Sequence, residues 1–309
     1  MEVIRDIADF PVLSFPVVTS GTFDGVHVGH QKILQRVMER ARQHNGQSVV
    51  ITYWPHPRLV LFPEDNDLRL LSTIDERIEH LRSFGIDYLL IIPFTKDFSR
   101  TSSRSFISDI LVKALHTKVL VIGYDHRFGK NREGSFEHLK AQKGKYGFEV
   151  EEIPREDIDN IGVSSTKIRK ALETGDLETA TSYLGRYYSL TSVVVEGNKL
   201  GRTIGYPTAN LAIPHSHKLI PANGVYAVWA TIDGERYPGM MNIGVRPTID
   251  GAHLTMEVHL LNFDQDIYGQ TITVSFVSYL RDEQRFNGLD ALKAQLVKDK
   301  AATAKALSL

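Results

Sequence analysis

The feature that most limits the possible folds of this chain is a change of apolar pattern near residue 184. Before it, short and almost uninterrupted apolar runs alternate with segments of helical period. Such runs are typical of strands buried on both faces, and their alternation with helices predicts a doubly wound, mostly parallel α/β sheet. The expected strands are 16–19, 48–53, 88–93, 118–122 and 148–153, and the expected helices are 29–45, 74–84, 103–116 and 134–146.

After residue 184, apolar and polar residues alternate with period two, as in 256–260 and 271–277. This alternation predicts half-buried strands. Asp233-Gly234 between two apolar segments is a hairpin signal, and three leucines between 289 and 296 mark a closing helix. We therefore expect a small antiparallel β-barrel with a C-terminal helix, and domains at 1–184 and 185–309.

Composition excludes several classes of function. The 36 basic and 37 acidic residues nearly cancel, so no global field attracts nucleic acid or an anionic membrane. The absence of cysteine excludes disulfides, thiolate metal sites and thiol nucleophiles. The first residues lack the layout of a signal peptide, and no apolar run is long enough to span a bilayer. We expect a soluble cytoplasmic protein that binds neither nucleic acid nor membranes.

Two histidines, His27 and His30, stand where the first apolar run turns into a helix. The glycines of residues 21–30 (G-T-F-D-G-V-H-V-G-H) let the backbone turn sharply. His30 then falls in the first turn of a helix, where free N–H groups and the helix dipole favour an anion. Histidines near a turn are often ordinary polar residues, so this motif predicts a phosphate site only together with other segments.

Two further segments point the same way. Residues 123–134 (G-Y-D-H-R-F-G-K-N-R-E-G) follow a buried strand, and residues 163–169 (V-S-S-T-K-I-R) begin another helix. Ligands bind beyond the carboxyl ends of parallel strands, so the turns at 21–30, 54–57 and 123–134 should share one edge. Residues 123–134 could instead be a basic surface loop. Ser164 and Ser165 of the other segment could merely cap a helix. Lys167 and Arg169 in a first helical turn favour an anion there.

The strongest signal in the second half is residues 201–210 (G-R-T-I-G-Y-P-T-A-N). A Gly-rich loop before two oxygen donors suits phosphate and magnesium, although the glycines could also serve only a tight turn. Glu257 lies on an alternating strand. A carboxylate there can accept a hydroxyl proton during phosphoryl transfer, or simply pair with a cross-strand cation.

The N-terminal motifs resemble the adenylyltransferase half of bacterial bifunctional riboflavin kinase/FMN adenylyltransferases, also called FAD synthetases. The motifs are G-T-F-D-G-V-H-V-G-H, T-Y-W-P-H-P, G-Y-D-x-R-F-G and S-S-T-x-I-R, and the match runs from about residue 14 to 184. The resemblance implies a Rossmann-like nucleotidyltransferase domain in which His27 and His30 contact ATP phosphates and stabilise the transferring α-phosphoryl group. It also implies ATP or phosphate contacts at Gly21, Phe23, Asp24, Gly25, Ser164, Ser165, Thr166 and Arg169, and flavin-side roles for Asp125 and Arg127. His126 and Asn131 depart from the Phe and Gly that are usual in the family.

The second half is similar to the riboflavin kinase module over nearly all of 184–309, through G-R-x-x-G-x-P-T-A-N, N-I-G-V-R-P-T and F-D-Q-D-I-Y-G. This similarity implies that Thr208 and Asn210 help to hold Mg²⁺ and the ATP phosphates, and that Glu257 is the general base toward the riboflavin 5′-hydroxyl. Gly201 and Gly205 would let the backbone approach the phosphates. Tyr187, Ser192 and Glu196 replace a frequent Pro, Gly and His of the family.

Together the two resemblances imply one FAD biosynthesis enzyme, with ATP, riboflavin and FMN as small-molecule substrates. The barrel would convert riboflavin to FMN, and the N-terminal domain would adenylylate FMN to FAD with release of pyrophosphate. Such nucleotidyl transfer needs in-line positioning and charge stabilisation but no covalent nucleophile. We expect a monomer or weak homo-oligomer.

Three other functions stay open at this point. One half could be only a flavin-binding or dimerising module, or the chain could be a flavin sensor without turnover. It could also be a different nucleotidyltransferase, including an aminoacyl-tRNA synthetase. The near-neutral charge and the absence of a K-M-S-K-S-like element disfavour tRNA as a substrate.

Overall fold

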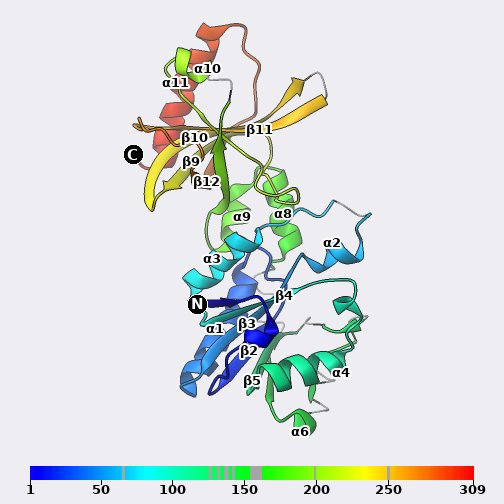
Figure 1. Cartoon of the computed structure of the whole chain (residues 1–309). Coiled ribbons are helices and arrows are strands. Elements are labelled where there is room, and N and C mark those ends of the chain that lie inside the picture. Colours follow the sequence, from blue (N-terminus) through cyan, green and yellow to red (C-terminus); the bar gives the residue numbers. More distant parts are fainter. Residues whose placement is uncertain are drawn as a thin grey trace. The chain divides into compact units, whose positions relative to one another are not determined.

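The computed structural model describes residues 1–64, 67–124, 127–130, 133–135, 139–140, 143–153, 162–197, 200–248 and 251–309. The chain forms two compact units, Met1–Ser165 and Thr166–Leu309 (Figure 1). Helices α8 (Ser165–Glu173) and α9 (Leu177–Leu184) fall almost entirely in the second unit, where α9 contacts barrel strands. The compact units therefore divide earlier than residue 184, and the expected boundary between the two functions stays a prediction.

The N-terminal unit is built on one six-stranded sheet in the order β1-β4-β3-β2-β5-β6. Every pairing in it is parallel, which confirms the doubly wound sheet expected from the apolar runs. The strands are β1 (Glu2–Ile4), β2 (Pro16–Ser20), β3 (Gln47–Trp54), β4 (Tyr88–Pro93), β5 (Val119–Gly123) and β6 (Glu149–Ile153). The short edge strand β1 was not expected, because three residues show no periodicity.

Helical segments connect these strands. They are η1 (Ile7–Asp9), α1 (Val28–Gln43), α2 (Pro57–Leu61), α3 (Ile74–Phe84), η2 (Phe98–Arg100), α4 (Ser103–Ser105) and α6 (Lys143–Tyr146). The helix expected at 103–116 forms, but most of it, η3 (Phe106–Ala114), has π-helical hydrogen bonding. The helix expected at 134–146 lies partly outside the described residues.

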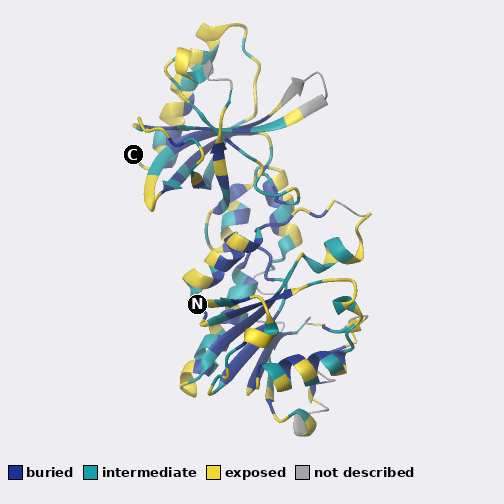
Figure 2. Cartoon of the chain, viewed as in Figure 1, coloured by how far each residue is buried: buried dark blue, intermediate teal, exposed yellow. Residues whose placement is uncertain are grey.

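Alternate residues of β3 show why its apolar run is continuous. Val49 and Ile51 belong to a core cluster with Ile107, whereas Val50 belongs to a different cluster with Leu34. The strand is therefore covered on both faces, and Figure 2 shows the resulting buried interior of the sheet.

The strand order reverses next to β2. The chain moves from β2 to β3 and β4 on one side and returns to β5 on the other. In such sheets the ligand binds at this reversal, beyond the carboxyl ends of the strands. The turns that begin after β2, β3 and β5 all start at that edge, as expected.

The C-terminal unit is a closed antiparallel barrel in the order β10-β11-β8-β7-β12-β9. Its strands are β7 (Tyr188–Val195), β8 (Ala209–Leu211), β9 (Gly224–Ile232), β10 (Glu235–Thr248), β11 (Gly251–Leu260) and β12 (Thr271–Arg281), with the short helix α10 (Leu200–Thr203) and the closing helix α11 (Leu289–Ala306). Asp233 and Gly234 have φ of 49° and 87° in the turn between β9 and β10, which confirms the hairpin signal.

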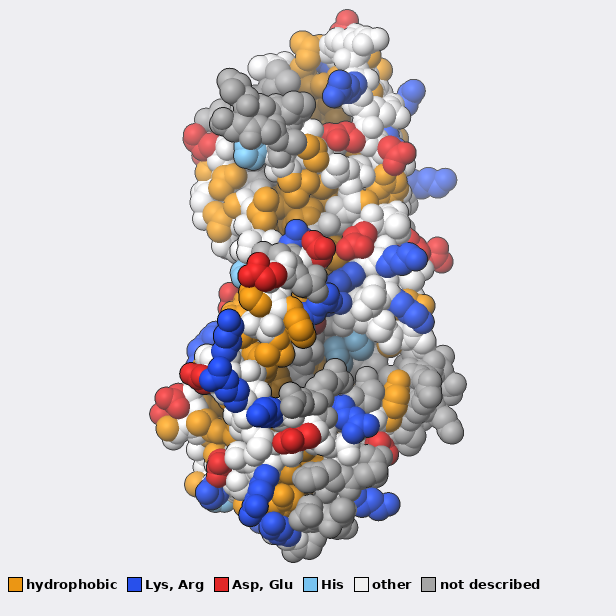
Figure 3. All heavy atoms as spheres, turned by 90° about the vertical axis from the view of Figure 1, so that its right-hand side faces the viewer, with side chains coloured by type: hydrophobic (Ala, Val, Ile, Leu, Met, Phe, Trp, Pro, Cys, Tyr) orange, Lys and Arg blue, Asp and Glu red, His pale blue; other side chains and the backbone are white. Residues whose placement is uncertain are grey.

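Acidic and basic side chains are interspersed on the face shown in Figure 3, in keeping with the balanced composition. In the part of the chain that the structure describes, no helix combines the length and apolar character needed to cross a membrane.

Candidate functional sites

The turn between β2 and α1 has an unusual backbone. Phe23, Gly25 and Val26 have φ of 47°, 78° and 40°, a region that side chains other than glycine seldom adopt. The turn is held from outside, because the Gly25 N–H donates to Ser72 Oγ at 3.1 Å. A Cβ on Gly25 would lie 2.8 Å from the Leu71 side chain. Only glycine fits this position without displacing the loop that supports it.

The two histidines of the turn stack on each other at the start of α1. Their ring centroids are 3.7 Å apart with an interplanar angle of 14°. His27 is the N-cap of α1, and its Nδ1 accepts from the His30 N–H at 3.3 Å. A neutral His27 therefore carries its proton on Nε2.

The His30 ring has a polar atom whose surroundings are unusual. Its Nδ1 is buried and has no hydrogen-bond partner among the described residues. Burial lowers the pKa of His30 well below its ordinary value, and the charges of His27 and Arg77 lower it further. The ring is therefore neutral at pH 7, and it lies at a helix N-terminus where an anion is favoured.

Asp24 connects this turn to two other segments. Its carboxylate is almost fully buried and accepts from the Leu71 and Ser72 N–H groups at 3.1 and 3.0 Å. Its main-chain carbonyl accepts from Ser165 Oγ at 3.2 Å. The structure thus brings Ser165 to the histidine turn, while the ATP-binding role of Asp24 stays a prediction.

For most of the other residues expected at this site, the structure gives a position in the fold. Gly21 packs against Phe23, and Ser164 directly precedes α8. Thr166 and Arg169 lie on α8 within the second compact unit. Arg127 is exposed, whereas Asp125, like His126 and Asn131, lies outside the described residues.

Sequence reasoning missed Arg77, a fully buried side chain on α3. The available signal was its spacing, because Arg77 stands three residues after Ile74 and four before Leu81, on the apolar stripe of the helix.

In the C-terminal unit, the Gly-rich loop closes on itself. The Tyr206 N–H donates to the Gly201 carbonyl at 2.8 Å, and a Cβ on Gly201 would lie 2.1 Å from Tyr206 O. Gly205 has φ of 84°. Both glycines are therefore needed for this turn, which leads directly to Thr208.

The structure gathers the three other expected residues of the barrel. Asn210 lies directly opposite Glu257 in the pairing of β8 with β11. Thr208 Oγ1 is 3.5 Å from Glu257 Oε2. A Cβ on Gly197 would lie 2.1 Å from Asn210 Nδ2, so this glycine makes room for the amide. Hydroxyl, amide and carboxylate groups thus lie together, half-buried.

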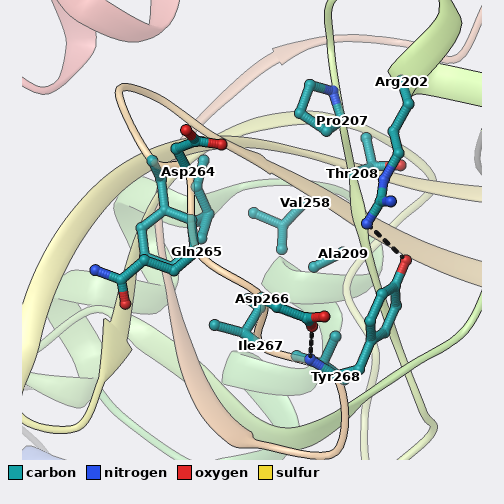
Figure 4. Close-up of a pocket in the computed structure, with 13 residues that line it drawn as sticks. Arg202, Pro207, Thr208, Ala209, Val258, Asp264, Gln265, Asp266, Ile267 and Tyr268 are labelled. Atoms are coloured by element: carbon teal, nitrogen blue, oxygen red, sulfur yellow. Dashed lines mark hydrogen bonds between the residues drawn. The ribbon is translucent and has the colours of Figure 1, made fainter.

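Two pockets meet at Thr208. The larger, of about 490 Å³, has mixed polar and apolar walls, and its polar residues include Arg202, Asp266 and Tyr268 (Figure 4). Arg202 Nη2 donates to the Tyr268 hydroxyl at 3.3 Å. The smaller, of about 240 Å³, contains Glu257. Its walls are largely apolar and include Ile204, Met240, Met241, Phe286, Leu292 and Leu296.

His259 was also missed by sequence reasoning. It lines the smaller pocket, and its Nδ1 is 2.7 Å from the carbonyl oxygen of Pro207, the residue before Thr208. Burial lowers the pKa of His259. The available signal was strand alternation, which places His259 on the same face of β11 as Glu257.

The chemistry of these donors fits a hard cation. Thr208, Asn210 and Glu257 offer only oxygen ligands, because the amide nitrogen of Asn210 is a hydrogen-bond donor. Among the described residues no cluster of three or more His, Cys, Asp or Glu side chains is arranged to hold a metal. A cation here would therefore rely on substrate phosphates and water, which is the usual behaviour of Mg²⁺.

An α/β unit with two stacked histidines at a helix N-terminus, joined to a barrel with a carboxylate beside the junction of two pockets, is an arrangement typical of a two-domain nucleotide-dependent transferase. Comparison with protein families specifies the class further. The family model described as FAD synthetase matches residues 12–167, and the one described as riboflavin kinase matches residues 184–307.

Curated relatives agree with both family models. A bifunctional riboflavin kinase/FMN adenylyltransferase of Escherichia coli strain K12 is 42% identical over 284 residues, which cover 92% of this chain and 90% of the relative. One of Haemophilus influenzae is 39% identical and covers 99% of both chains. The chain belongs to the bifunctional riboflavin kinase/FMN adenylyltransferase family.

A solved structure shares the fold of the whole chain. It is described as a macrolide-efflux protein from Streptococcus pneumoniae, is 33% identical, and matches with a TM-score of 0.86 over 97% of both chains. Its description names another activity, but the family models and curated relatives agree with each other on flavin chemistry.

Proposed function

We propose that the two sites divide the family's two reactions, with riboflavin phosphorylation in the barrel and FMN adenylylation at the histidine turn. Riboflavin kinase and FMN adenylyltransferase are the activities of the family to which the chain belongs. The observation that carries the assignment is that each family model covers one of the two candidate sites. The domain bounds 1–184 and 185–309 are part of this proposal.

In the proposed kinase site, the larger pocket takes ATP and the smaller, apolar pocket takes the flat flavin ring. The γ-phosphorus would then lie near Thr208, where the pockets meet. The bond from the riboflavin 5′-oxygen to the γ-phosphorus forms as the β–γ bond breaks, ADP leaves, and Glu257 accepts the hydroxyl proton. Thr208 and Asn210 would hold Mg²⁺, which offsets negative charge on the phosphates when bound.

In the proposed adenylyltransferase site, a phosphate oxygen of FMN attacks the α-phosphorus of ATP, and pyrophosphate leaves. His27 and His30 would donate hydrogen bonds to the phosphate oxygens as charge builds on them. The buried Nδ1 of His30 and the helix N-terminus support this assignment, because both favour an incoming anion. Ser164, Ser165, Thr166 and Arg169 would hold the outer phosphates, and Arg127 with Asp125 would face the flavin.

The proposal extends to the setting of the enzyme. We infer a cytoplasmic monomer or weak homo-oligomer that acts on ATP, riboflavin and FMN and does not bind nucleic acid. The balanced charge of 36 basic and 37 acidic residues supports the last point.

The division of labour is tested with two variants of the full chain, each supplied with ATP, Mg²⁺ and either riboflavin or FMN. We expect His30→Ala to lower FAD formation by about two to three powers of ten and to leave FMN formation intact, because one hydrogen-bond donor to the developing charge is lost. Glu257→Gln should do the opposite, since the proton acceptor is lost only in the barrel. Flavins are resolved by chromatography.

Equal loss of both steps in either variant would contradict separate sites. A wild-type chain that binds ATP and flavin tightly but forms neither FMN nor FAD would identify a sensor instead.

A further inference from the structure

Arg77 on α3 is a buried cation with incomplete hydrogen bonding. It is 0% exposed and is among the largest fully buried side chains of the described residues. Its Nη1 donates to Thr52 Oγ1 at 3.1 Å and to the Tyr53 carbonyl at 3.3 Å. Its Nε and Nη2 are buried and have no hydrogen-bond partner among the residues that the structure describes. A buried guanidinium is normally paired, because desolvation of an unpaired charge costs several kcal/mol.

The surroundings of Arg77 do not supply the missing partner. The guanidinium lies over the Trp54 ring, 5.7 Å from its centroid, which offsets part of the desolvation. The Asp24 carboxylate raises the pKa of Arg77, but burial, the larger effect, lowers it. That carboxylate also accepts from the N–H groups of Leu71 and Ser72.

Arg77 lies behind the histidine turn. Its neighbours Ile74 and Ile78 share a core cluster with Phe23 and Val26 of that turn. Thr52, which accepts from Arg77, donates through the same hydroxyl to the Thr22 carbonyl at 3.1 Å. The Arg77 charge is also felt at His30, whose pKa it lowers.

The ligand-free site therefore holds two incompletely satisfied polar groups next to the same turn. One is the guanidinium of Arg77 and the other is the imidazole of His30, whose Nδ1 has no partner among the described residues. A triphosphate at the turn would bring negative charge into a region of low dielectric constant, where its attraction to a fixed cation is screened little. Negative charge at the turn would then offset a further part of the cost of burying Arg77.

We propose that Arg77 is a positioning residue for adenylyl transfer. Its guanidinium supplies a fixed positive charge behind His30, and the negative charge of the bound triphosphate offsets that charge. This inference rests on the proposed assignment of the histidine turn to the adenylyltransferase site. Arg77 acts through the turn and its electrostatic field, without touching the substrate.

The test uses the full chain with Arg77→Met, which keeps the length of the side chain and removes its charge. FAD formation from FMN and ATP should fall by about 10- to 100-fold, a loss of the size seen when a group that supports a metal-binding histidine is removed. The loss should appear in kcat, together with a higher KM for ATP, because the fixed charge attracts the triphosphate before and during the transfer. The midpoint of thermal unfolding should stay the same or rise, because an unpaired buried charge is removed. Riboflavin phosphorylation by the same sample should be unchanged.

Arg77→Lys is the matched control, because it keeps the charge and loses the planar guanidinium. It should recover most of the lost rate of FAD formation. A third readout is independent of activity. Nuclear magnetic resonance of a histidine-labelled chain, with the His30 signal assigned through His30→Gln, should show a higher His30 pKa in Arg77→Met and little change in Arg77→Lys.

Three results would overturn the inference. The first is full FAD formation in Arg77→Met, and the second is an equal loss of FAD formation in the Met and Lys variants. The third is a loss of FAD formation in Arg77→Met and Arg77→Gln that is explained by a lower unfolding temperature of both variants. His30→Ala is measured beside them. If His30→Ala forms FAD normally, the proposed site itself is wrong. If His30→Ala is inactive and Arg77→Met is not, only the role of Arg77 is wrong.

Discussion

At the scale of single residues, the N-terminal site is dominated by buried polar side chains. Burial lowers the pKa of His30 and keeps its ring neutral, and the Asp24 side chain accepts hydrogen bonds from main-chain N–H groups. Both residues support a turn with left-handed backbone at Phe23 and Val26. The motif residues thus serve partly to stabilise the turn, and only some of their polar groups are available to contact a ligand.

The lowered pKa of His30 predicts a pH-dependent stability of the N-terminal unit. Between the folded-state pKa and the ordinary value of about 6.5, the unfolded chain binds more protons than the folded one. Stability should therefore fall as the pH is lowered below about 6.5, and His30→Gln should remove that part of the loss. Denaturant unfolding is followed through Trp54 in a Trp229→Phe background, since these are the chain's 2 tryptophans. Parallel stability curves for the two proteins would contradict the prediction.

The residue scale is also where the sequence was least complete. His27, His30, Thr208 and Glu257 could be selected because they belong to motifs with a recognisable spacing. Arg77 and His259 could not, because a single polar residue on an apolar stripe or strand gives no sign of whether it is buried or what it contacts. Their partners, Tyr53 O and Pro207 O, become neighbours only in the folded chain.

At the scale of elements, α11 packs against the barrel with a face that carries both apolar and polar residues. Leu292 and Leu296 line the smaller pocket, and the next residues on the same face, Asp299 and Thr303, are buried. Asp299 forms a two-point ion pair with Arg281 of β12, at 2.7 and 2.9 Å. The end of β12 and the helix are thus fixed to each other beside the proposed flavin pocket.

Loss of this pair should loosen the barrel. Asp299→Ala leaves the Arg281 guanidinium without its carboxylate partner, and we expect a loss of about 3 kcal/mol in the free energy of unfolding. The measurement is denaturant unfolding followed through Trp229 of β9, in a Trp54→Phe background. The exposed neighbour Lys298 provides the control, since Lys298→Ala should change stability by no more than about 0.5 kcal/mol. Similar small effects of both substitutions would show that the pair does not stabilise the barrel.

Elements were the scale at which the sequence predicted most. The strands β2 to β6 and helices α1 and α3 were expected within a few residues, because continuous apolar runs and helical periods report burial directly. The π-helical hydrogen bonding of η3 was not predicted, because π-helices are rare and an apolar helical pattern is therefore interpreted as an α-helix.

At the scale of the whole molecule, two separate sites on one chain make a definite prediction about mixtures. FMN that is released by one molecule should be usable by another. His30→Ala and Glu257→Gln, each unable to make FAD from riboflavin alone, should therefore make FAD when they are mixed with ATP and Mg²⁺. Chromatography of the flavins gives the result, and either variant alone is the control. A mixture that accumulates FMN without FAD would show that FMN must pass between the sites of one molecule.

The sequence by itself determined the fold class, the order of the two halves and the family, because these depend on periodicity and on motifs that are local in the chain. Tertiary structure alone decided which of the motif residues meet. It brought Ser165 to Asp24, Asn210 opposite Glu257, and Thr208 to the junction of two pockets. It also buried Arg77 and linked it through Thr52 to Thr22 of the histidine turn, since burial and hydrogen bonding depend on contacts between segments that lie far apart in the sequence.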